Sequence, residues 1–180
     1  TKFYPYENQF GKVFSKDSRG LKIIIPFLRE QFNNEKEIIK SICDSFFVSI
    51  LEKKLNVIVN EKEITHETIR EFVFNPEYYI QETSEIKEEF TPLYVGTYLN
   101  ETPKPITISD GVKDYEFNLY FRYDEAIPKG RMAIVRTIGM KIEDKKIKNN
   151  VNKPFNAILL GGAAEDAYLK SLENESHTEL

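Results

Sequence analysis

The sequence has no tryptophan and a single cysteine among its 180 residues, and it contains no long apolar run. One cysteine cannot form an intramolecular disulfide, which indicates a reducing compartment. A membrane-spanning helix needs roughly 20 apolar residues, and the N-terminal segment lacks the basic-then-apolar order of a signal peptide. We therefore expect a cytoplasmic protein with no membrane partner.

Residues that carry common catalytic chemistry are also scarce. His66 and His177 are far apart, and neither has cysteines or carboxylates at zinc-site spacing around it, so we expect no metal site. Cys43 falls inside an apolar helical pattern, which is typical of a core residue, and no serine stands in a G-x-S-x-G turn. The Glu85-Ile86-Lys87 triplet matches half of a metal-dependent nuclease pattern, but such triplets arise by chance in a highly charged chain. The sequence predicts no complete catalytic site.

The net charge of −4 and the isoelectric point near 5.4 argue against nucleic-acid binding by bulk electrostatics. Cations do gather in one region. They are Arg131, Lys141, Lys145, Lys146, Lys148 and Lys153. Such a run is typical of a solvated hairpin tip, and a phosphate- or nucleic-acid-binding role is the less favoured alternative.

The 41% hydrophobic and 30% charged residues fit a single globular domain over 1–180. Its clearest element is a helix at 35–54, capped by Asn33 or Asn34. The apolar residues of this helix recur at three- and four-residue steps: Ile38, Ile39, Ile42, Phe46, Phe47, Ile50 and Leu51.

The remaining pattern predicts both strands and helices. Residues 1–19 indicate an irregular lead-in. Strands are expected at 20–28, at 55–59 and, within 106–160, at 106–110, 115–125, 131–142 and 155–162, with a hairpin turn at Asp110-Gly111. Short helices are expected at 65–72, at 76–90 and at 163–173, the second ended by Pro92. The fold class is therefore α+β, around one mixed or antiparallel sheet.

Arg136 is the most informative charged residue, because it falls in phase with the apolar residues Met132, Ile134, Ile138 and Met140. A buried guanidinium must meet a carboxylate, a phosphate or the edge of the sheet, since an unpaired charge in the core costs several kcal/mol. The alternative is a bulge near Gly139 that shifts the phase and leaves Arg136 in solvent.

Two further features bear on function. Gly161-Gly162 lies between a strand and a helix, where phosphates bind, but without the further glycine and lysine of a phosphate loop we expect a plain helix-entry turn. The chain also begins with Thr1 instead of Met, which we interpret as the sign of a piece cut from a longer multidomain protein.

Four landmarks in order carry a family resemblance: GLKIIIPFL, IIKSICDSFFVSILEKKLNVIV, RMAIVRTIGMKI and YLKSLENESH. They resemble the region after the ATP-binding head in bacterial proteins of the GHKL superfamily, which includes gyrase, the heat-shock chaperones, histidine kinases and MutL. More narrowly, they resemble ATP-binding proteins from gene neighbourhoods linked to phage defence. The resemblance implies a transducer domain, with helices packed on one side of a small sheet.

In gyrase-like relatives a basic residue of this domain reaches the γ-phosphate held by the head. No loop here matches that motif, so Arg136 and Lys141 are our candidates from strand phase and position. The head's D-x-G-x-G motif is missing, since Asp110-Gly111-Val112-Lys113 lacks the second glycine. ATP and Mg²⁺ are therefore implied for the parent protein only.

The resemblance thus implies a non-catalytic relay between an upstream head and a downstream effector, and it admits a homodimer. The rival hypothesis is a self-contained module that binds a protein or peptide through a sheet edge or through its aromatic N-terminal segment. Whether the parent is an enzyme stays open at this point.

Overall fold

The computed structural model describes residues 29–147 and 154–173. The chain divides into two units, and the described part of the first contains only the 3₁₀ helix η1 (Glu30–Phe32). The second unit begins at Asn34 and holds every other element. The expected strand at 20–28 and the expected lead-in at 1–19 lie outside the described residues.

Helix α2 (Glu35–Leu51) confirms the clearest prediction. The Asn34 side chain caps it by accepting hydrogen bonds from the backbone N–H groups of Lys36 and Glu37, at 3.1 and 3.4 Å. The helix ends three residues earlier than expected, and Lys53 just beyond it adopts a left-handed conformation with φ of 61°. Its apolar stripe enters the core, where Ile39, Cys43 and Phe47 are fully buried.

A small hairpin and a short helix follow α2. Strands β1 (Val57–Val59) and β2 (Lys62–Ile64) pair antiparallel around a turn at Asn60. Helix α3 (Ile69–Val73) lies within the helix expected at 65–72. Just before it, the Thr65 N–H donates to the Thr68 hydroxyl at 2.9 Å and the Thr68 N–H donates to the Thr65 hydroxyl at 3.4 Å.

The expected helix at 76–90 is wrong. That segment is irregular apart from the 3₁₀ helix η2 (Thr83–Glu85), although it buries four large side chains, those of Tyr78, Tyr79, Ile86 and Phe90. Helix α4 (Thr91–Asn100) starts where Pro92 was expected to stop one. Proline lacks an N–H that the first helical turn does not need, so it suits a helix start as well as a stop.

Five strands form a mixed sheet in the order β3-β4-β7-β5-β6, in which only β5 and β7 run parallel. The strands are β3 (Lys104–Ser109), β4 (Asp114–Tyr123), β5 (Arg131–Val135), β6 (Lys141–Lys146) and β7 (Phe155–Gly161). The hairpin turn at Asp110-Gly111 is confirmed, with Asp110 Oδ1 accepting from the N–H groups of Val112 and Lys113 at 2.8 and 2.7 Å. The α+β class with a mixed sheet is therefore confirmed.

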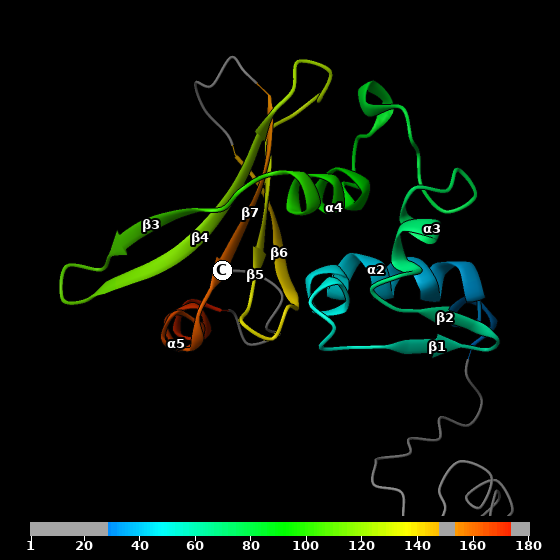
Figure 1. Ribbon diagram of the computed structural model, residues 1–180, viewed down its shortest axis with the longest axis horizontal. Coiled ribbons are helices and arrows are strands. Elements are labelled where there is room, and N and C mark those ends of the chain that lie inside the picture. The colour runs from blue at the N-terminus through cyan, green and yellow to red at the C-terminus, as the bar shows by residue number, and fades with distance from the viewer. Residues whose placement is uncertain (1–28, 148–153, 174–180) are drawn as a thin grey trace, which may run out of the picture. The chain divides into compact units, whose positions relative to one another are not determined.

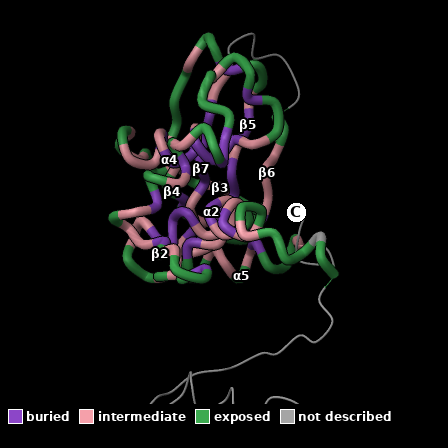
Figure 2. Tube along the Cα trace, turned by 90° about the vertical axis from the view of Figure 1, so that its right-hand side faces the viewer, coloured by how far each residue is buried: buried purple, intermediate pink, exposed green. Residues whose placement is uncertain are grey.

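Helices cover both faces of this sheet (Figure 1). Helices α2 and α4 pack on the face that carries Ala133, Val135 and Ile158, within one buried cluster. Helix α5 (Ala163–Leu172) packs on the opposite face, against Phe117 and other residues of a second cluster. The transducer resemblance implied helices on one side only, and α5 departs from that arrangement. Buried residues run along the central strands β5 and β7 and along α2 (Figure 2).

None of the helices in the described ranges is both long and apolar enough to cross a membrane.

Candidate functional site

The segment expected as one strand at 131–142 is two strands joined by a tight turn, residues 136–140. The Arg136 N–H donates to the Met140 carbonyl at 2.9 Å, and the Gly139 N–H donates to the Arg136 carbonyl at 2.7 Å. Gly139 has φ of 86°, which suits a residue without a Cβ atom, and the β5–β6 register shifts between Ile134 and Val135. The sequence pattern hid this turn because apolar residues continue through it.

One side of the 136–140 turn is fastened to α2. The helix is interrupted at Phe46, whose φ and ψ of −126° and 15° are not helical. Three residues later the Ser49 N–H donates to the Gly139 carbonyl at 3.2 Å, and Lys54 Nζ donates to the Thr137 carbonyl at 2.9 Å. The interruption of α2 thus coincides with a backbone bond to a different element.

The other side of the turn is fastened to β7 and α5. The Thr137 hydroxyl donates to the Gly161 carbonyl at 3.0 Å, and its N–H donates to Asp166 Oδ1 at 2.9 Å. Arg136 forms an ion pair with Glu173, directly after α5. The 136–140 turn therefore links the helices of the two sheet faces.

Arg136 lies in the turn and not in a strand, so the strand phase that was expected to bury it does not apply. The irregularity near Gly139 that the alternative expected is present, but it does not leave Arg136 in solvent. Its side chain is 20% exposed and contacts a fully buried carboxylate, that of Glu173. Of the anions expected to pair with a buried Arg136 guanidinium, the structure provides a carboxylate. Whether Arg136 ever contacts a phosphate stays a prediction.

Lys141 begins β6, and its Nζ lies 5.8 Å from the centre of the Tyr94 ring in α4. Arg136 instead contacts Glu173 beside α5. The two candidate cations are therefore engaged with elements on opposite faces of the sheet, and the structure does not bring them together.

Arg131 is the charged residue that the sequence reasoning misjudged. It was grouped with a solvated basic run, yet its side chain is only 4% exposed. Its guanidinium contacts Glu88 at 2.6 Å, Asp144 at 3.2 Å and the Lys87 carbonyl at 2.9 Å.

The surroundings of Arg131 explain how a cation is held there. The guanidinium carbon lies 4.6 Å from the centre of the Phe90 ring, and the Tyr94 hydroxyl donates to Asp144 at 2.9 Å. The hydrogen bond from Arg131 lowers the pKa of Glu88, whereas burial, followed by the Asp144 charge, raises the pKa of Tyr94. The signal was present in the sequence, because Arg131 directly precedes the apolar residues of β5.

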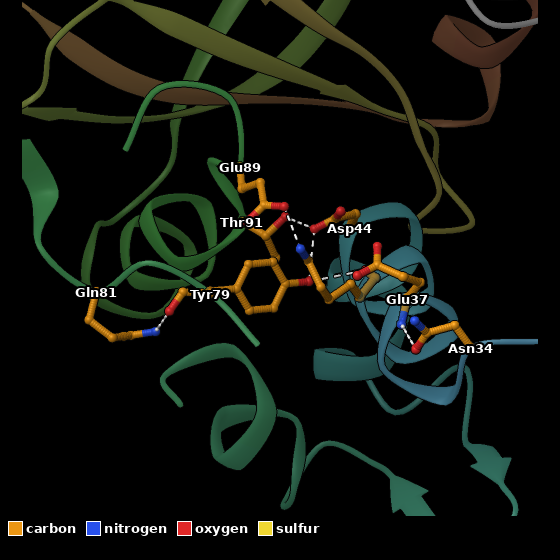
Figure 3. Close-up of polar contacts among 8 residues, drawn as sticks. Asn34, Glu37, Asp44, Tyr79, Gln81, Glu89 and Thr91 are labelled. Atoms are coloured by element: carbon orange, nitrogen blue, oxygen red, sulfur yellow. Dashed lines mark hydrogen bonds and ion pairs between the residues drawn. The ribbon is translucent and has the colours of Figure 1, made fainter. Parts of the chain in front are cut away.

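A second polar cluster joins α2 to the irregular segment and α4 (Figure 3). Asp44 Oδ1 accepts from the Tyr79 hydroxyl at 2.9 Å and from the Thr91 hydroxyl, and Lys40 pairs with Glu89 nearby. Burial, followed by the Asp44 charge, raises the pKa of Tyr79 well above its ordinary value. A neutral tyrosine can only donate to this carboxylate, so the cluster serves to fasten the segments together.

The other candidate positions have structural contacts. Burial raises the pKa of the Cys43 thiol to about 12, which makes it a poor nucleophile. The Gly162 N–H donates to Glu165 Oε2 at 3.1 Å, so the glycine pair forms the helix-entry turn that was expected. No cluster of potential metal ligands occurs within residues 29–147 and 154–173.

Comparison of the chain with protein-family models, with curated proteins and with solved structures found no match.

Proposed function

We propose that this chain is a non-catalytic transducer module of a larger ATP-binding protein, relaying the nucleotide state of an upstream head to a downstream effector. The observation that supports it best is the 136–140 turn. It forms hydrogen bonds to α2 on one face of the sheet, to strand β7 within the sheet, and to α5 on the other face. Packed and hydrogen-bonded elements transmit displacement because they do not deform freely. A movement of α2 therefore reaches α5 through a single turn.

The role of ATP in this proposal comes from the family resemblance. ATP and Mg²⁺ are held by the head, and Arg136 or Lys141 supplies a cation to the phosphates when the two domains close. Arg136 then exchanges Glu173 for phosphate, since the guanidinium fork binds both groups. The proposal places the protein in the cytoplasm, with the head of the same chain as its first partner and a homodimer as a further assembly.

The test is ATP hydrolysis by the longer protein that contains this segment. Arg136→Ala and Lys141→Ala are compared with wild type, and Lys104→Ala, at an exposed position of β3, is the matched control. We expect one of the first two variants to lose about 100-fold or more in kcat while remaining folded, and the control to be unchanged. Full activity in both the Arg136 and the Lys141 variant would show that neither residue provides the proposed phosphate contact.

A second candidate function rests on strand β3. Within the described residues it pairs only with β4, so its other edge offers backbone groups to an added strand, and Val112 at the hairpin tip is 96% exposed. This arrangement favours a protein- or peptide-binding module. Two results would favour this function over the relay. The parent protein would not hydrolyse ATP, and Thr107→Pro in β3 would abolish the binding of its partner.

A further inference from the structure

A cleft of about 250 Å³ lies where α4 meets the ends of β4 and β7. Its walls are partly apolar, formed by Ile86, Leu93 and Ile127, and its polar lining includes Asn156, Arg122 and Asp124. Apolar walls with a few convergent polar groups are the usual composition of a small-molecule site.

Asn156 is the buried polar residue of this cleft. It is only 1% exposed on the second position of β7, and neither its Nδ2 nor its Oδ1 has a hydrogen-bond partner. Arg131 stands beside it in the β5–β7 register, and Arg131 Nε is likewise without a partner. A buried unpaired amide costs roughly 1–3 kcal/mol, so the fold retains an unsatisfied donor and an unsatisfied acceptor at the base of this cleft.

The mouth of the cleft carries a cation. Arg122 faces Asn156 across the β4–β7 ladder, its side chain is 46% exposed, and its Nη2 lies 3.5 Å from Asp124 Oδ2. An exposed ion pair of this length contributes little, about 0–1 kcal/mol, so the guanidinium can turn to another anion.

Helix α4 leaves room in the same place. Leu93, Gly96 and Asn100 line the cleft at three- and four-residue steps, and a Cβ atom added at Gly96 would meet no atom within 4 Å. A glycine in a helix interior costs about 0.5–1 kcal/mol relative to alanine, and here it leaves space open towards the cleft.

We propose that this cleft binds a small molecule that carries an anionic group and an amide-like edge, the edge pairing with Asn156 and the anionic group with Arg122. A side-chain carboxamide presents one donor and one acceptor side by side, so it complements a group with the reverse pair. Nucleobases and carboxamides both have such an edge, which gives two sources: a nucleoside monophosphate or a carboxamide amino acid. The proposal is independent of the relay.

Isothermal titration of the 180-residue chain tests the site, with uridine monophosphate, adenosine monophosphate and L-glutamine as probes and inorganic phosphate as the charge-only control. We expect one of the three probes to bind with a Kd below about 1 mM, with phosphate alone showing no binding. The probe that binds identifies the source of the ligand. No binding by any of the three overturns the proposal, as does equal binding of phosphate.

Two variants keep the test decisive. Gly96→Leu fills the cleft from a helix, and Asn156→Leu removes the unpaired amide at similar volume. Each should weaken binding at least about tenfold, and Asn156→Leu should raise Tm, because it replaces an unsatisfied polar group by an apolar one. Unchanged binding in both variants, or a lowered Tm in Asn156→Leu, contradicts the assignment.

Discussion

Gly139 and Ser49 are so close that a Cβ atom added to Gly139 would lie 2.4 Å from the Ser49 backbone nitrogen. The same nitrogen donates its hydrogen to the Gly139 carbonyl at 3.2 Å. Two backbones can approach this closely only where one residue has no side chain. The contact fixes the 136–140 turn against α2, and the proposed relay depends on it.

Gly139→Ala should therefore be strongly destabilising. The substitution adds a side chain at φ of 86° and forces it against the backbone of α2, and we expect a loss of about 2–4 kcal/mol in the free energy of unfolding. Urea denaturation of the purified variant measures this loss.

Two other glycines provide controls that separate strain from overlap. Gly111 has φ of 87° but open space around it, so Gly111→Ala should cost only about 1 kcal/mol. Gly96 is helical with open space, so Gly96→Ala should stabilise by about 0.5–1 kcal/mol. Equal losses at Gly139 and Gly111 would show that the contact with Ser49 contributes nothing.

Arg131→Met should destabilise by about 3 kcal/mol, because it leaves the partly buried Asp144 carboxylate with the Tyr94 hydroxyl but without its cation. Arg122→Met is the matched control, since its ion pair with Asp124 is exposed and should cost under about 1 kcal/mol. Both free energies are read from urea denaturation at neutral pH. A loss below 1 kcal/mol for Arg131→Met would mean that the buried pair makes no net contribution.

Tyr79→Phe should lower the free energy of unfolding by about 1–2 kcal/mol, because Asp44 then keeps only the Thr91 hydroxyl. Tyr115→Phe is the control, as its hydroxyl donates to the exposed Asp110 and its removal should change stability by under about 0.5 kcal/mol. Thermal unfolding followed by circular dichroism compares the two variants. Equal shifts in Tm would show that the hydrogen bond from Tyr79 to Asp44 contributes no more to stability than the exposed bond from Tyr115 to Asp110.

Stability should fall with rising pH because of Cys43. Its thiol ionises near the ordinary pKa of 9.0 when unfolded but near 12 when folded. Between these values the unfolded state holds fewer protons than the native state, so the contribution of the buried neutral thiol is present below pH 9 and is lost above it.

The measurement compares wild type with Cys43→Ala between pH 9 and 10, because the tyrosines titrate alike in both proteins and cancel in the difference. The stability advantage of wild type should shrink by about 1 kcal/mol over this unit, because the unfolded thiol is already half ionised at pH 9. Parallel stability curves would contradict the raised pKa.

The elements that the sequence predicted are those with local causes. The α2 stripe and its Asn34 cap, the Asp110-Gly111 turn, and the helix after Gly162 depend on residues a few positions apart. The segment 76–90 failed because its buried aromatic residues had helical spacing without forming helical hydrogen bonds. Burial alone produces such spacing, so periodicity could not distinguish the two cases.

The candidate site was predicted less completely than the fold. Strand phase indicated that Arg136 needs an anion, but its partner Glu173 is 37 residues further along the chain, directly after α5. Arg131 was misplaced because its partner Glu88 lies in the irregular segment 43 residues earlier. The unpaired amide of Asn156 had no sequence signal, since an asparagine beginning a strand is ordinary.

The sequence by itself determined the α+β class, the main helix and the hairpin turn. The tertiary structure alone decided which charges are buried, which helix covers which sheet face, and that the 136–140 turn joins them. Local propensity and periodicity are properties of neighbouring residues, whereas the environment of a charge is set by segments that meet only after the chain has folded.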